Sequence, residues 1–214
     1  MITGSSGKPK SYEKLDFDLR GLTGISNAQI EEHLSLYAGY VKQVNGLNQE
    51  LAGMLVRGQA SGKSPGFAEL TRRLGFEYNG MILHEYYFGN LRPGADPKPT
   101  AESTLADALA SSFGSIDVWR NDFQAIGEMR GVGWVILFQD PMTGRLTNHW
   151  ITLHQDGVPA GFKPLLVMDV WEHAFMRDYR ATERARYTEA FLRNIDWPVV
   201  ETRLREERAV RAAA

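Results

Sequence analysis

Apolar residues recur at three- and four-residue spacing along two long stretches in the first half of the chain, the period of a helix with one buried face. The first stretch begins after Ser26, a favourable N-cap, and runs to Leu55. A glycine-rich segment at 58–66 interrupts the pattern, and a second stretch runs from Phe67 to Gly89. The pattern therefore predicts two long helices joined as a hairpin.

The second half of the chain changes period. Two shorter helical patterns come first, at 101–111 and 115–129. Runs rich in β-forming residues follow, and a proline- and glycine-containing turn at 141–144 separates the first two of them. We expect these runs to be three strands, at 133–139, 148–154 and 164–170. Helical patterns then return from Glu172 to the end of the chain.

This order predicts an α+β fold: a helical hairpin domain at 1–92, beginning with a flexible arm at 1–12, and a C-terminal α+β domain at 101–214 with a three-stranded antiparallel sheet. The segment between them, rich in proline, glycine and charge, reads as a linker. No apolar run approaches the roughly 20 residues that span a bilayer. The first ten residues lack the apolar core of a secretory signal, so we expect a cytoplasmic protein without a membrane partner.

The composition of the chain excludes several classes of partner and of metal site. The 214 residues carry 24 Lys and Arg against 26 Asp and Glu, a net charge of −2, which argues against a nucleic-acid partner. The chain has no cysteine, which excludes disulfides, zinc–thiolate sites and iron–sulfur clusters. Any metal must therefore be held by histidine and carboxylate.

Three of the five histidines lie at positions where they could serve as metal ligands. His33 and His84 lie on the two long helical patterns, and His173 follows Asp169 by four residues where a strand gives way to a helix. Three imidazoles with one carboxylate suit Fe, Mn, Co or Zn better than Ca or Mg. Each histidine alone is more often an ordinary core residue, and spacing by itself leaves both interpretations open.

Residues 169–175 read DVWEHAF, which resembles the DVWEHAY signature of the iron/manganese superoxide dismutases. Shorter runs resemble other segments of that family in the same order: FGS at 113–115, GVGW at 131–134 and NIDW at 194–197. The segment around His84 resembles the helix that carries the family's second ligand. The resemblance extends from about Tyr12 to the last helix.

The resemblance implies one Fe or Mn ion per chain and the disproportionation of superoxide to O₂ and hydrogen peroxide. It implies four metal ligands, namely His33, His84, Asp169 and His173. Counting back from Tyr40 would instead put Glu32 at the first position. We favour His33, because a second carboxylate would change the charge of the site and lower its redox potential.

The surroundings of the site depart from the family pattern. Tyr37 stands where a second histidine is common, and the gateway tyrosine is displaced to Tyr40, so we expect these two tyrosines to form a rearranged gateway. Met176 also replaces a common tyrosine. Gln155 resembles the glutamine of the manganese-type NQD motif, which hydrogen-bonds the solvent at the metal. Gly80 occupies the position that supplies this glutamine in many iron enzymes, so the pattern favours manganese without settling Fe against Mn.

Further roles follow from the resemblance. Trp134 and Trp171 are expected to wall the site, and Arg184 to attract the anionic substrate. In the family Glu172 reaches across a dimer interface, so we expect a homodimer in which it contacts His173 of the partner subunit.

Two other interpretations stay open. The departures around the ligands would also suit a catalytically degenerate relative that serves as a structural or interaction protein. A non-haem iron oxygenase is disfavoured, because four protein ligands leave too few open positions on the metal.

Overall fold

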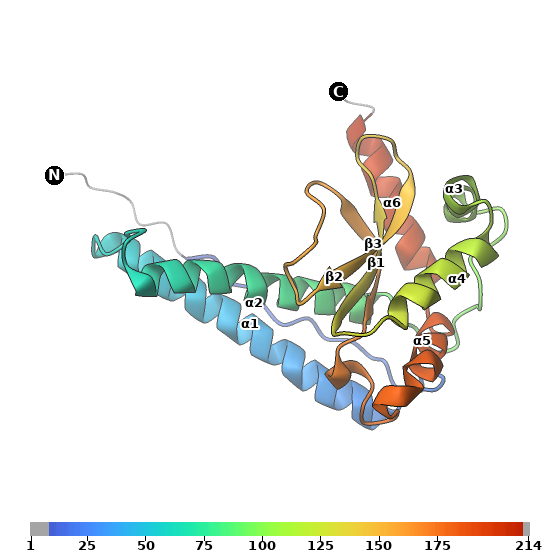
Figure 1. Cartoon of the computed structure of the whole chain (residues 1–214), viewed down its shortest axis with the longest axis horizontal. Helices are drawn as coiled ribbons and strands as arrows, with labels where there is room; N and C mark the ends of the chain where they lie inside the picture. Colours follow the sequence, from blue (N-terminus) through green and yellow to red (C-terminus); the bar gives the residue numbers. More distant parts are fainter. Residues whose placement is uncertain (1–8, 212–214) are drawn as a thin grey trace.

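The computed structural model describes residues 9–211 as a long helical hairpin beside a small, helix-covered sheet (Figure 1). The hairpin consists of α1 (Asn27–Val56) and α2 (Pro65–Gly89). Ser26 caps α1, because its side chain accepts a hydrogen bond from the backbone N–H of Gln29, and Ser64 caps α2 in the same way. The predicted hairpin is confirmed.

The sheet has three antiparallel strands in the order β2-β1-β3. Strand β1 (Gly133–Gln139) matches the expected range, whereas β2 (Leu146–Thr152) lies two residues earlier and β3 (Lys163–Asp169) one residue earlier. The shift of β2 has a local cause: Asp140 accepts a hydrogen bond from the N–H of Gly144, and the chain re-enters the sheet directly after this tight turn. The three-stranded antiparallel sheet is confirmed, with a corrected second strand.

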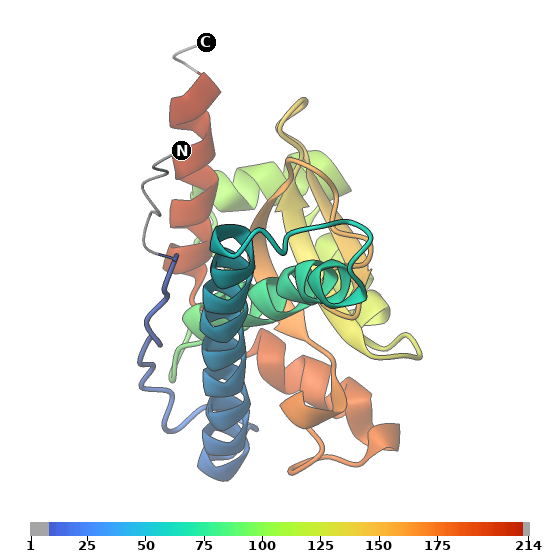
Figure 2. The same cartoon turned by 90° about the vertical axis from the view of Figure 1, so that its left-hand side faces the viewer.

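Helices cover both faces of the sheet (Figures 1 and 2). Two of them, α3 (Thr104–Phe113) and α4 (Ile116–Gly127), pack on one face, while α2 contacts β3 from the other and α6 (Trp197–Arg211) runs beside β3. Between β3 and α6 the chain forms short 3₁₀ turns at Glu172–Ala174 and Ala181–Glu183 and then α5 (Arg184–Leu192).

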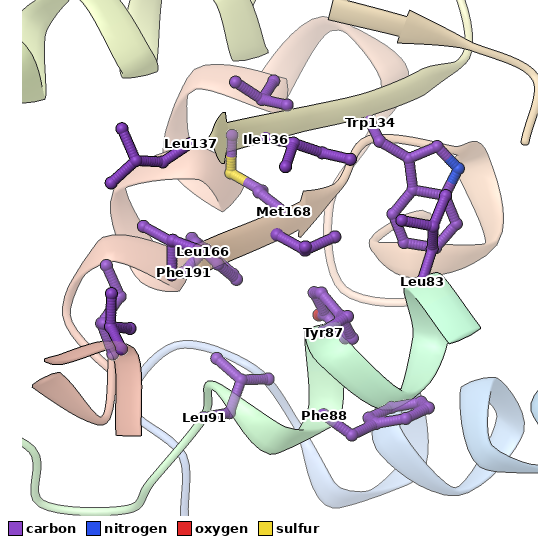
Figure 3. Close-up of a cluster of buried hydrophobic side chains, with 14 of the residues drawn as sticks. Leu83, Tyr87, Phe88, Leu91, Trp134, Ile136, Leu137, Leu166, Met168 and Phe191 are labelled. Carbon is purple, nitrogen blue, oxygen red and sulfur yellow. The ribbon is translucent and has the colours of Figure 1, made fainter. Parts of the chain in front are cut away.

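The hydrophobic core joins the hairpin to the sheet. Figure 3 shows Leu83 and Tyr87 of α2 facing Ile136 of β1 and Met168 of β3, and all seven positions of β1 are buried. Burying such side chains contributes roughly 1.5–3 kcal/mol each. This shared core fixes α2, which carries His84, relative to the end of β3, which carries Asp169. The division into two domains stays a prediction.

The chain entering the hairpin is held in place from Tyr12 onward. The backbone N–H and C=O of Tyr12 both pair with the side chain of Asn45, and its ring contacts Tyr78 edge-on. Most of the arm expected at 1–12 lies outside the described residues. Within the described part of the chain, none of the helices has the length and apolar character needed to cross a membrane.

Candidate metal centre

His84 occupies a fully buried position on α2, and its backbone partner fixes the tautomer of its ring. Nδ1 lies 2.5 Å from the carbonyl oxygen of Gly80, one helical turn earlier. A carbonyl can only accept, so Nδ1 carries the proton and Nε2 presents a lone pair. That Nε2 is buried without a hydrogen-bond partner among the described residues, 3.6 Å from the Oδ2 atom of Asp169. His84 is thus aimed at a carboxylate with no hydrogen between them.

Asp169 ends β3, and its two oxygens have different partners. Oδ1 accepts a hydrogen bond of 2.8 Å from the N–H of Trp171, which fixes the carboxylate plane. Oδ2 lies 3.2 Å from Nε2 of His33 and 3.1 Å from Nε2 of His173. Burial alone would raise the pKa of Asp169, but the interaction with His173 and the hydrogen bonds of His173 and His33 hold it well below its ordinary value. The group is therefore an anion.

One atom from each of these four residues lies within 4.8 Å of the others. The side chains of three are fully buried, and that of His173 is 25% exposed. Burial lowers the pKa of His33 and lowers that of His84 well below its usual value, so both rings are neutral near pH 7. Neutral imidazoles and an ionised carboxylate are the states that bind a metal.

These residues fit a cation. In an apolar site, the lone pair of His84 Nε2 has no hydrogen-bond donor and faces the carboxylate of Asp169. Three nitrogens and one oxygen form a donor set suited to Fe, Mn, Co or Zn.

The structure also separates the two candidates for the first ligand. Glu32 is exposed and forms an ion pair of 2.9 Å with Arg177, whereas His33 lies in the cluster. In a helix with 3.6 residues per turn, positions 33, 37 and 40 share one face, which is the face that α1 turns toward α2.

A second layer of side chains surrounds the ligands. Nε1 of Trp134 donates to Nδ1 of His154 at 3.1 Å, and Nε2 of His154 lies 2.7 Å from the hydroxyl of Tyr40. An indole can only donate, so Nδ1 of His154 is the acceptor and Nε2 carries the proton, which goes to the oxygen of Tyr40. The hydroxyl hydrogen of Tyr40 is then directed elsewhere.

Electrostatics agrees with that assignment. Burial lowers the pKa of His154 to about 4, so the ring is neutral near pH 7. Burial, followed by the charge of Asp169, raises the pKa of the Tyr40 phenol, which keeps it protonated. The rings of Tyr40 and Trp134 each lie 5.0 Å from that of His84. Tyr40 reaches this place because residue 80 is glycine: a Cβ there would lie 2.6 Å from the tyrosine ring.

The amino-acid sequence of this chain is similar to those of known proteins. A model of the family described as "Iron/manganese superoxide dismutases, C-terminal domain" matches residues 101–203. The chain is 36% identical over 196 residues to "Superoxide dismutase [Fe]" of Aquifex pyrophilus, covering 90% of this chain and 89% of the relative. It is 35% identical over 192 residues to "Superoxide dismutase [Mn]" of Mycolicibacterium smegmatis, covering 88% and 89%. The chain belongs to the iron/manganese superoxide dismutase family.

Within this family framework, the structure places Gln155 at an exposed position, and the role expected of it stays a prediction. Its side chain is exposed, and the preceding residue, His154, is fully buried beside the ligands. The cause is the backbone after β2: Leu153 adopts a left-handed conformation with φ 54°, which resets the direction of the chain and turns His154 inward. The sequence offered one signal for this inward-facing residue, which was His154 itself, one position before the expected glutamine.

The two tyrosines expected as a joint gateway have separate partners. The hydroxyl of Tyr37 accepts from the N–H of Leu15 at 3.0 Å and donates to Glu85 at 2.8 Å. Burial raises the pKa of Tyr37 to about 12. Tyr37 therefore ties the N-terminal segment to the hairpin, while Tyr40 alone reaches His154.

Of the remaining expected residues, Trp171 and Glu172 lie beside His173. The ring of Trp171 stacks on His154 at 4.9 Å and on His173 at 5.8 Å. Glu172 is exposed and lines a groove of about 360 Å³ together with His173 and Met176. The guanidinium of Arg184 donates to the carbonyls of Met129 and Gly131, so it braces the loop before β1.

Proposed function

We propose that this chain is a superoxide dismutase that holds one Fe or Mn ion and converts two superoxide ions and two protons into O₂ and hydrogen peroxide. The observation that carries the proposal is the unprotonated Nε2 of His84 facing the ionised Asp169 inside a buried three-histidine site. A degenerate relative without a metal has no physical reason to keep such a repulsive pair buried. Relatives named for iron and for manganese match equally well, so the metal is left to experiment.

The protein's part in the reaction is to set potential, access and proton supply. A bound Fe or Mn ion would supply the one-electron chemistry. Asp169 offsets positive charge at the centre, and Trp134 and Trp171 limit the entry of water. Tyr40 holds a phenolic proton beside the ligands and is the residue we assign to proton delivery.

His154 takes the role first expected of Gln155. A glutamine amide has two hydrogens to donate, whereas neutral His154 has one, and that one goes to Tyr40. We infer that the Tyr40 hydroxyl hydrogen, rather than the residue on the β2 loop, is directed toward the centre. This single-donor arrangement would shift the redox potential relative to a glutamine-bearing enzyme.

We also propose a homodimer in which Glu172 hydrogen-bonds the partner's His173. Nε2 of His173 faces Asp169, so Nδ1 points the other way, and the ring is partly exposed next to the exposed Glu172. Light scattering of the wild type and of Glu172→Gln at micromolar concentration tests this: a fully active wild-type monomer would rule it out.

The experiment for the main proposal is reconstitution of the purified chain with Fe or with Mn, followed by metal counting by plasma mass spectrometry and a superoxide-consumption assay. Close to one ion per chain together with dismutation supports the proposal. A folded chain that takes up neither metal would favour the interaction-protein alternative. The cytoplasmic location stays a prediction, to be tested by fractionation of the source cells.

A further inference from the structure

Gln29 is a buried polar side chain that none of the roles above uses. It lies on α1 one turn before His33, and only 1% of the residue is exposed. Burying an amide side chain is costly unless its hydrogen-bonding groups are satisfied. Its partners therefore indicate what it does.

Both ends of the Gln29 amide bind the turn that carries the last ligand. Nε2 donates to the carbonyl oxygen of His173 at 2.6 Å, and Oε1 accepts from the N–H of Arg177 at 3.1 Å. The amide thus bridges the two ends of a five-residue turn in which His173 is the first residue. No other polar side chain of α1 contacts the backbone of His173 in the hydrogen bonds found among the described residues.

Two neighbouring contacts join the same segments but act at the surface. The side chain and N–H of Ser26 both donate to Asp178, and Glu32 pairs with Arg177. All of these contacts are exposed to solvent, which weakens them. The buried bridge made by Gln29 is the contact that reaches a ligand residue.

We propose that Gln29 is a positioning residue for the metal centre: its amide locks the His173 turn onto α1 and thereby sets His173 relative to His33. The two ligands are 140 positions apart in the chain, and each lies close to the same oxygen of Asp169. His173 is the one partly exposed ligand, so it has the least surrounding packing to hold its ring in place. Loss of the bridge should free that ligand first.

The test compares Gln29→Met, which keeps the length of the side chain and removes both hydrogen bonds, with Glu32→Gln, which removes only the exposed ion pair with Arg177. Enzyme loaded with manganese or iron is incubated with excess EDTA, and metal loss is followed over time. We expect Gln29→Met to lose metal about 10–100-fold faster than wild type, and Glu32→Gln to stay within about threefold. The visible spectrum of the loaded Gln29→Met protein should also shift, since the His173 ring reorients.

A Gln29→Met protein with wild-type metal loss and spectrum would overturn the proposal. If this variant does not fold, Gln29→Leu replaces it, which also removes both hydrogen bonds and keeps the position apolar. Faster metal loss from this variant would support the proposal, and unchanged or slower loss would overturn it. The inference rests on the proposed metal function but fails separately, because an active wild type indifferent to Gln29→Met refutes only the positioning role.

Discussion

Two of the ligands, His84 and Asp169, and the side chains packed around the metal centre are oriented by different kinds of partner. His84 and Asp169 are each fixed by a backbone group at most four residues away, the carbonyl of Gly80 and the N–H of Trp171. By contrast, Tyr40, His154 and Trp134 orient one another through side chains that come from three separate parts of the chain. A local backbone partner survives changes elsewhere, whereas a side-chain network holds only while every member is present. The surrounding layer is therefore where this chain can differ from its family without losing the metal.

Breaking the ligand set should have the largest effect. His84→Ala removes a nitrogen donor that no neighbouring side chain can replace, so we expect metal content to fall close to zero and dismutation with it. Plasma mass spectrometry and a superoxide assay on the same sample measure both. His149→Phe is the matched control, because it alters a histidine outside the cluster. Full metal content in His84→Ala would remove His84 from the ligand set.

Breaking the surrounding layer should leave the metal in place and slow the reaction. We expect His154→Ala to retain metal but to lose about 10–100-fold in turnover, because Trp134 and Tyr40 then lack their shared partner. His154→Gln should recover part of this loss, since its amide can accept from the indole and donate to the phenol. Gln155→Ala, at an exposed position, should match wild type. Equal losses in the Gln155 and His154 variants would contradict the assignment.

The two tyrosines offer a finer separation. Tyr37→Phe leaves Glu85 and the N–H of Leu15 without their partner, so we expect the free energy of unfolding to fall by about 1–3 kcal/mol with little change in turnover. Tyr40→Phe should show the reverse pattern, with slower turnover and a smaller loss of stability. Denaturant unfolding and the superoxide assay on both variants provide the comparison. Slow turnover in Tyr37→Phe alone would return Tyr37 to the gateway.

The smallest expected effect lies in the sheet, away from the metal. His149 packs edge-on between Phe138 and Phe162, and burial lowers its pKa. A group whose pKa is lower in the folded state contributes stability above its unfolded pKa, about 6.5, and loses that stability as pH falls toward its folded value. We therefore expect the Tm difference between wild type and His149→Phe to move in favour of the variant between pH 7 and pH 5. A difference that does not change with pH would show that His149 titrates normally.

Local patterns explain what the sequence could predict. The hairpin follows from helical periodicity and a serine N-cap, and the ligand positions follow from one short motif together with two helical histidines. The pattern of apolar and polar residues does not reveal the left-handed backbone of Leu153. The sequence therefore could not predict that His154, rather than Gln155, faces the ligands. The partner of Tyr37 was equally hidden, because it is the backbone N–H of Leu15, in a segment whose path depends on tertiary packing.

The close approach of Tyr40 to Gly80 restricts how this enzyme can be altered. A side chain at position 80 would occupy the space that the Tyr40 ring now fills. A side chain at position 80 therefore requires the Tyr40 ring to move, and such a movement would disturb the contact between its phenol and His154. Position 80 and the Tyr40–His154 pair are thus coupled, so a substitution of Gly80 should disturb the proton donor as well as α2.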